Sequence, residues 1–309
     1  MVGAVDGMDI YKLTPNDSGF RLIERADFES RTAKRERWYR TNSSGEGVQY
    51  AVCPVCDNPI QIIGLYRLPK HVRAPFGKHA CKTIPDLASD DEAARERCPY
   101  FKPRQHDQHA RKTTEDTQSQ KILEILITQF DRVEYILRKQ TGIRFSRAKL
   151  KSMLETYRET RGHLYTGATV INVPWIFAYM SNATALFKQH VSNNEALTEA
   201  VVQKVEGAQV GVDGRVANEP GCWFDLSVSF IHHRYKKDKE EGGLQESMAM
   251  LVTSERKGVL VDVYKQVIEF DHQYFQNLID QPDGQGYRNM ELVALAHEVL
   301  GDLIRRGNA

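Results

Sequence analysis

The 309-residue chain lacks several patterns that would reveal a function directly. It has no glycine-rich phosphate loop, no dinucleotide-binding fingerprint, and no serine or cysteine nucleophile placed with histidine in a recognised catalytic motif. No run of about 18 apolar residues is present, so we expect no transmembrane helix and no membrane partner. The first residues, MVGAVDGMDI, contain neither a basic nor an apolar segment, so we also expect no signal peptide.

A strong charge of one sign is also missing. The net charge is +1, from 42 Lys and Arg against 41 Asp and Glu, and 41% of the residues are hydrophobic. Residues 1–112 carry 19 basic and 15 acidic residues, or +4, and the remainder carries 23 and 26, or −3. This composition is typical of a globular protein with a core, and the mild bias neither supports nor excludes a nucleic-acid partner.

Cysteine is scarce, yet four of the five cysteines lie within 46 residues. Cys53 and Cys56 have the two-residue spacing that lets both thiolates of one tight turn reach a single metal ion, and structural zinc takes four Cys or His ligands. Their clustering favours a metal site over disulfides, and therefore a reducing cytosolic environment. The second pair of ligands is left open by the spacing, with four candidates: His71, His79, Cys81 and Cys98.

Three short motifs follow one another between residues 48 and 110: Cys-Pro-Val-Cys at 53–56, Phe-Gly-Lys-His at 76–79 and Cys-Pro-Tyr at 98–100. In these motifs the segment resembles the zinc ribbon of the competence-protein CoiA-like group and related bacterial proteins of unknown function. The resemblance implies a Zn²⁺ site made of Cys53, Cys56, His79 and Cys98. The chain departs from the pattern at Cys81 and at an acidic insert, 86–96, so an all-thiolate site with Cys81 in place of His79 is the alternative. Four such ligands close the coordination shell, so the zinc is expected to be structural.

A basic segment lies upstream of the cysteines. Residues 31–40 contain five basic residues with Trp38 and Tyr39, which is typical either of a phosphate-contacting segment with a stacking aromatic or of a solvated surface whose aromatics enter the core. The first alternative predicts a surface for DNA or RNA formed by seven residues: Arg31, Arg35, Arg37, Arg40, Arg67, Lys70 and Arg73.

The expected architecture is α+β, with two domains. A zinc-ribbon domain spans 1–115, and an α+β domain spans 116–309. The second is expected to be helical over 119–205, with helices at 119–139, from Ser146, at 176–188 and at 194–205. An antiparallel β meander is expected over 207–270, and a closing helix over 288–306.

The CoiA-like group is associated with a restriction-endonuclease-like nuclease domain, so the resemblance implies that a Mg²⁺-binding triad could be present. Such a site needs carboxylates that hold the metal and a lysine beside the attacking water. Asp225, Glu255 and Lys257 fit the pattern, with Glu246 as a further carboxylate. The alternative is that 254–258 is a hairpin turn between two strands, with Asp225 as a surface acid.

These observations favour a bacterial cytosolic protein that associates with nucleic acid, in phage defence or DNA uptake. The two alternatives are a Mg²⁺-dependent nuclease and a non-catalytic scaffold subunit that binds a protein partner.

Overall fold

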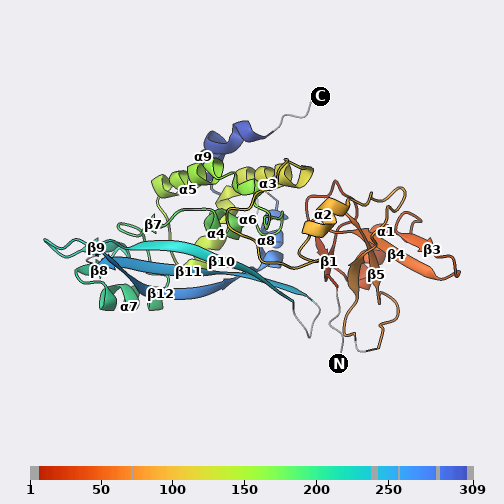
Figure 1. Cartoon of the computed structure of the whole chain (residues 1–309), viewed down its shortest axis with the longest axis horizontal. Helices are drawn as coiled ribbons and strands as arrows, with labels where there is room; N and C mark the ends of the chain where they lie inside the picture. The colour runs from red at the N-terminus through yellow and green to blue at the C-terminus, as the bar shows by residue number, and fades with distance from the viewer. Residues whose placement is uncertain (1–6, 71, 238–242, 257, 283–285, 305–309) are drawn as a thin grey trace. The chain divides into compact units, whose positions relative to one another are not determined.

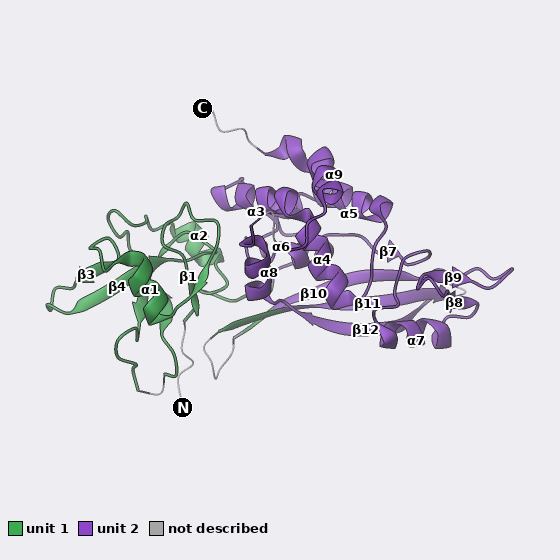
Figure 2. Ribbon diagram, turned by 180° about the vertical axis from the view of Figure 1, so that it is seen from behind, with its two compact units in different colours: residues 1–105, 235–246 green, residues 106–234, 247–309 purple. Residues whose placement is uncertain are grey.

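The computed structural model describes residues 7–70, 72–237, 243–256, 258–282 and 286–304 (Figure 1). The chain divides into two compact units, shown in two colours in Figure 2. The first contains residues 1–105 and 235–246, and the second contains 106–234 and 247–309. The first boundary along the chain therefore lies at 105/106, ten residues before the predicted position at 115/116. The α+β class is confirmed, with antiparallel sheets and a helix near the C-terminus.

The first unit is built on a four-stranded antiparallel sheet. The strands follow one another in order: β3 (Tyr39–Thr41), β4 (Gly47–Val52), β5 (Pro59–Ile63) and β6 (Phe76–His79). The unit also contains four short elements: β1 (Ile10–Tyr11), β2 (Arg21–Leu22), α1 (Arg25–Thr32) and α2 (Glu92–Arg97). The fully buried rings of Tyr11 and Phe28 pack edge to face at 5.2 Å and form part of its core.

The helices of the second unit differ in two places from the predicted ones. The predicted helix 119–139 is two helices, because Gln129 leaves helical geometry at φ −120° and ψ 21°. The predicted helix 176–188 is wrong in its second half, since the helix ends at Tyr179 and Thr184 already lies in a strand. The unit contains α3 (Thr117–Thr128), α4 (Phe130–Thr141), α5 (Arg147–Glu159), η1 (Gly162–Leu164), α6 (Val173–Tyr179), α7 (Glu195–Lys204), α8 (His272–Ile279), α9 (Met290–Leu300) and η2 (Gly301–Leu303).

A second four-stranded antiparallel sheet contains the long strands, in the order β12, β11, β10, β7. Helices α4, α5, α6 and α9 lie on one side of these strands and α7 on the other (Figure 1). The turn predicted at 254–258 is wrong for 254–256, because these residues continue the strand and pair with 259–261. The strands are β7 (Thr184–Ala185), β10 (Ser227–Lys237), β11 (Leu244–Arg256) and β12 (Val259–Glu269), and a separate hairpin contains β8 (Ala208–Val210) and β9 (Val216–Asn218).

The core of the second unit is rich in aromatic rings. Trp175 on α6 stacks on Phe270 with ring centroids 4.7 Å apart and planes 8° from parallel. Its indole N–H donates to Gln140 Oε1 at 2.7 Å, so the one polar atom of this fully buried ring is paired. Within the described part of the chain, every helix is too short or too polar to cross a membrane.

Candidate metal centre

Three cysteines and one histidine converge in the first unit. The ligand atoms of Cys53, Cys56, His79 and Cys98 all lie within 4.8 Å of one another, and all four side chains are buried. Cys53 Sγ and Cys98 Sγ are 3.8 Å apart, and Cys56 Sγ is 3.3 Å from His79 Nε2. Zinc–sulfur bonds of about 2.3 Å at tetrahedral angles place two sulfurs about 3.8 Å apart, so the arrangement fits a four-coordinate metal ion.

The first pair of ligands is fixed by a tight turn at the end of β4. The N–H of Cys53 donates to the carbonyl of Asn58 at 2.8 Å, and the N–H of Asp57 donates back to the carbonyl of Cys53 at 3.1 Å. Asp57 has a left-handed backbone at φ 59°, which Asp tolerates better than most residues, and it lets the chain reverse into β5. The turn therefore directs both thiols to the same side.

The third ligand, His79, is the last residue of β6. It pairs in register with Ile60 on β5, the strand that leaves the turn of the first two ligands. Its imidazole lies edge to face against Phe101, with ring centroids 5.4 Å apart. Strand pairing and ring packing therefore hold Nε2 toward the sulfurs.

The fourth ligand, Cys98, follows α2 directly. The carboxylate of Asp91 caps this helix by accepting from the N–H of Ala94 at 2.9 Å. Beyond the helix, the carbonyl of Cys98 accepts from the N–H groups of Phe101 and Lys102. The helix ends on this turn, and the turn fixes the position of the thiol.

Asn58 joins the two halves of the site. Its side chain is 1% exposed, its Nδ2 donates to the carbonyl of Cys56 at 3.1 Å, and its Oδ1 accepts from the N–H of Asp91 at 2.7 Å. The residue thus connects the first ligand turn to the start of the helix that precedes Cys98. The sequence offers no signal for this role, because the long-range partner of Asn58 is set by the tertiary structure.

A buried lysine supports the same turn. Lys12 is 3% exposed, its ammonium forms an ion pair with Asp57, and its backbone bonds Val52 in both directions at 2.9 Å. The ammonium also donates to the carbonyl of Pro15 at 3.1 Å. The sequence offered no signal for this contact, since 45 residues separate Lys12 from Asp57.

The electrostatics of the three thiols favour a cation at the centre. Burial raises the pKa of Cys53, but hydrogen bonds from Cys56 and Cys98 and from backbone N–H groups outweigh it, so the pKa lies well below the usual value. Burial, followed by hydrogen bonding with Cys53, raises the pKa of Cys56, and the same two causes raise that of Cys98 strongly. Three adjacent buried thiolates repel one another, and a divalent ion removes this repulsion because it binds all of them.

Cys81 is not part of the cluster. Its side chain is exposed, and its Sγ lies 3.7 Å from the carbonyl of His79. The geometry therefore brings His79 together with Cys53, Cys56 and Cys98, and the all-thiolate set with Cys81 in place of His79 is not formed. His71 lies outside the described residues.

The predicted basic surface is distributed over two segments of the first unit. Five of its members are exposed and two, Arg37 and Arg40, are half-buried; the exposed ones are Arg31, Arg35, Arg67, Lys70 and Arg73. Trp38 does not offer a ring for stacking, because it is 8% exposed and its N–H donates to the carbonyl of Leu13 at 2.9 Å. Tyr39 is half-buried against Phe28, with ring centroids 5.7 Å apart.

Two residues of the predicted nuclease triad are described, Asp225 just before β10 and Glu255 near the end of β11. Asp225 and Glu255 are exposed, and the hydroxyl of Ser254 donates to the carbonyl of Asp225 at 2.6 Å. Lys257 lies outside the described residues, and Glu246 is buried at 3% exposure. The triad remains a prediction.

Comparisons with family models, curated proteins and solved structures found no significant match to this chain. The resemblance of residues 48–110 to the CoiA-like group therefore also remains a prediction. The metal centre is defined by its own geometry alone.

Proposed function

We propose that the first unit is a zinc-stabilised module that binds the phosphate backbone of DNA or RNA, in a cytosolic protein. The metal is assigned as zinc because three thiolates and an imidazole in a closed, buried tetrahedron form a typical structural zinc set. Since all four positions are filled by the protein, no open position is left for a reacting water. The role of the ion is to hold the β4–β5 turn, the end of β6 and the segment after α2 together.

The observation that carries the proposal is the position of Tyr66. This residue lies in the loop between β5 and β6 and is 44% exposed, with the Arg25 guanidinium 4.6 Å and the Lys34 ammonium 5.8 Å from the centroid of its ring. Its hydroxyl donates to that of Tyr39 at 3.1 Å. Tyr66 thereby joins the start of the loop after β5, which continues into Arg67, to the basic segment 31–40, although the two are far apart in sequence.

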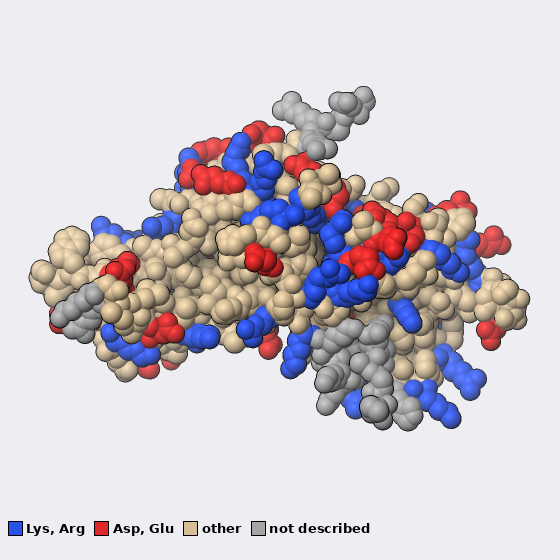
Figure 3. All heavy atoms as spheres, in the orientation of Figure 1, with Lys and Arg blue, Asp and Glu red and all other residues tan. Residues whose placement is uncertain are grey.

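The resulting surface combines cations with an accessible aromatic ring. Glu29 offsets part of the charge, because it pairs with Arg25 at 3.0 Å and Lys34 at 3.3 Å. Exposed cations remain on both segments. On the face of the first unit shown in Figure 3, Lys and Arg lie along the lower edge, and most acidic side chains form a separate group above them. Cations that follow a backbone, together with an aromatic ring for a base, are typical of single-strand binding.

The test is a salt titration of binding to a labelled oligonucleotide of mixed sequence. We expect log K to fall linearly with log salt, by about 0.7 per phosphate contacted on a single strand or about 0.9 on a duplex. The triple variant Arg35→Glu, Arg67→Glu and Lys70→Glu should weaken binding by more than tenfold and reduce the slope. Arg234→Glu, an exposed arginine of the second unit, is the matched control.

Three outcomes would reject the proposal: no binding, binding that salt does not change, or equal losses in the triple variant and the control. Mg²⁺-dependent cleavage of the oligonucleotide that is lost in Lys257→Ala would instead favour the nuclease. Indifference to nucleic acid together with one stoichiometric protein partner would favour the scaffold. Placement in phage defence or DNA uptake is part of the same proposal and rests on the resemblance of residues 48–110.

A further inference from the structure

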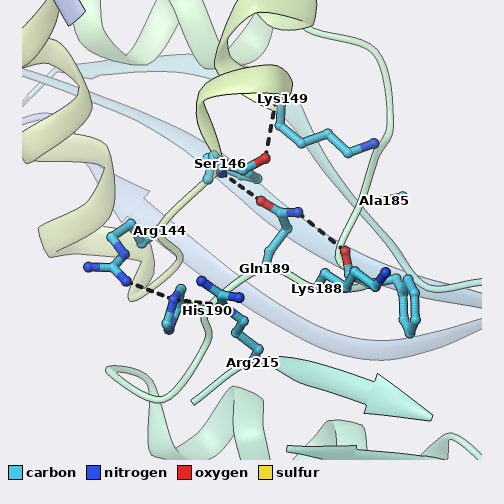
Figure 4. Close-up of a pocket in the computed structure, with 10 residues that line it drawn as sticks. Arg144, Ser146, Lys149, Ala185, Lys188, Gln189, His190 and Arg215 are labelled. Carbon is cyan, nitrogen blue, oxygen red and sulfur yellow. Dashed lines mark hydrogen bonds between the residues drawn. The ribbon is translucent and has the colours of Figure 1, made fainter. Parts of the chain in front are cut away.

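The second unit contains a pocket of about 660 Å³ with a strongly basic lining. Its volume lies within the range of about 300–1,000 Å³ that is usual for small-molecule sites. None of the described residues that line it is acidic. The charged and aromatic members of the lining are Arg144, Phe145, Lys149, Phe187, Lys188, His190 and Arg215 (Figure 4).

Two guanidinium groups meet at one imidazole nitrogen in this pocket. Arg144 Nη2 lies 2.7 Å from His190 Nε2, and Arg215 Nε donates to the same atom at 3.0 Å. Figure 4 shows the two arginines approaching His190 from opposite sides. Because arginine can only donate, both contacts make His190 Nε2 an acceptor, and burial, followed by the charges of Arg144 and Arg215, lowers the pKa of His190.

The backbone fixes this arrangement. Arg144 N donates to the carbonyl of His190 at 3.0 Å, and His190 also forms a β-bridge with Arg215. Main-chain pairing therefore holds the backbones of both arginines next to His190. Asp213 offers one partial counter-charge to Arg215 at 3.6 Å, and both of these side chains are more than half exposed.

The floor of the pocket is rigid and polar. Gln189 is 4% exposed, its Oε1 accepts from the N–H of Ser146 at 2.7 Å, and its Nε2 donates to the carbonyl of Phe187 at 3.2 Å. Ser146 caps α5 by accepting from the N–H of Lys149 at 3.4 Å. The positive end of this helix therefore adds to the charge of the side chains.

We infer that this pocket binds a nucleoside phosphate, with the phosphate held by guanidinium N–H groups of Arg144 and Arg215 that do not bond His190, and with the base against Phe187. A phosphate matches paired guanidiniums, because its oxygens accept two parallel hydrogen bonds from each. Phe187 is 37% exposed and lines the same pocket, which offers an apolar face for a base. A free nucleotide and the phosphorylated end of an oligonucleotide both present this chemistry. The inference does not depend on the metal centre or on the basic surface of the first unit.

The experiment is calorimetric titration of the full chain with adenosine 5′-monophosphate, inorganic phosphate and adenosine. We expect the nucleotide to bind more tightly than phosphate, and phosphate more tightly than adenosine. Arg144→Gln and Arg215→Gln should each weaken nucleotide binding by about tenfold or more, since each removes a charged hydrogen-bond donor. Arg234→Gln is the control and should bind as the unchanged protein does.

A second arm compares an oligonucleotide with and without a 5′-phosphate. In the triple variant of the first unit, tighter binding of the phosphorylated strand than of the unphosphorylated one identifies a polynucleotide end as the source, and equal binding of the two strands identifies a free nucleotide. The inference is overturned if adenosine binds as tightly as the nucleotide, if none of the probes binds, or if Arg215→Gln leaves the affinity unchanged. Arg215 is an exposed residue, so this variant keeps the test open if Arg144→Gln fails to fold. The triple variant of the first unit should not change nucleotide affinity, so the two proposals can fail separately.

Discussion

The sulfurs of Cys53 and Cys98 lie 3.8 Å apart, although 45 residues separate the two in the chain. One belongs to the turn after β4 and the other to the turn after α2. Burial raises the pKa of both thiols, but hydrogen bonds from Cys56 and Cys98 bring that of Cys53 below its usual value, whereas hydrogen bonding with Cys53 raises that of Cys98 further. A divalent cation removes this conflict, since it stabilises every thiolate that it binds.

The ligand set is tested by two cysteine variants that differ in geometry. Cys98→Ser removes a clustered ligand, and Cys81→Ser removes an exposed thiol outside the cluster. We expect about one zinc per chain in the unchanged protein and in Cys81→Ser, and little or none in Cys98→Ser. Elemental analysis of the purified variants measures this. Retention of zinc by Cys98→Ser together with its loss from Cys81→Ser would contradict the assignment.

Removal of the ion should destabilise the first unit selectively. The free energy of metal binding to such sites is largely folding free energy, so a chelator should expose amides of residues 47–102 to hydrogen exchange. Amides of α4 and α6 in the second unit should keep their protection. Mass spectrometry of exchange with and without chelator makes the comparison, and equal loss of protection in both units would refute a local role for the metal.

Asn58 is a positioning residue whose replacement should weaken metal binding without removing a ligand. Asn58→Ala deletes both bonds that connect Cys56 to the start of α2, and such supporting contacts are worth about 10- to 100-fold in metal affinity. Competition with a chromogenic chelator gives the affinity. Asn16→Ala, at an exposed position, should have no effect. An unchanged affinity in Asn58→Ala would show that the ligands hold their geometry unaided.

Asp116 should make stability depend on pH in the acid range. Burial raises the pKa of its carboxyl, but the charge of Lys112 and hydrogen bonds from Ser119 outweigh it, so the pKa is lowered. A lowered folded-state pKa gives stability that is present above the unfolded value, about 4, and is lost as pH falls through the folded value. Asp116→Asn can still cap α3 but should flatten this acid dependence, and Asp116→Ala should cost about 1 kcal/mol at pH 7. Urea unfolding across about pH 2.5–7, a range that includes the usual carboxyl pKa, provides the measurement. If Asp116→Asn has the same pH profile as the unchanged protein, Asp116 is not the source of the acid dependence.

The pair of Arg288 and Asp131 should couple strongly. Asp131 is fully buried and accepts from Arg288 Nε at 2.9 Å and from the N–H of Asn289 at 2.7 Å, just before α9. Arg288→Gln leaves a buried carboxylate without its cation and should cost about 3 kcal/mol. The double variant with Asp131→Asn should be less destabilised than Arg288→Gln alone. Additive losses in urea unfolding would mean that the pair does not interact.

Local sequence signals predicted much of the secondary structure. Ser146 and Asn194 begin helices α5 and α7 as predicted, because each side chain accepts a hydrogen bond from the first turn. The meander expected over 207–270 is confirmed for residues 244–253 and 259–269, since alternating apolar residues suit a sheet with one buried face. The predicted secondary structure was wrong where tertiary contacts override the turn preference of the local sequence. At 254–256, cross-strand pairing extends β11 through residues whose composition resembles a turn.

By itself, the sequence determined the first pair of metal ligands, Cys53 and Cys56, because a two-residue cysteine spacing carries its own geometry, and it determined the α+β class through periodicity. Only the tertiary structure decided that His79 joins the cluster and Cys81 does not, since strand β6 directs the former inward while the latter lies on the surface. Likewise, the structure alone placed Arg144 and Arg215 on opposite sides of His190. Their main-chain pairing is long-range, and no local pattern encodes it.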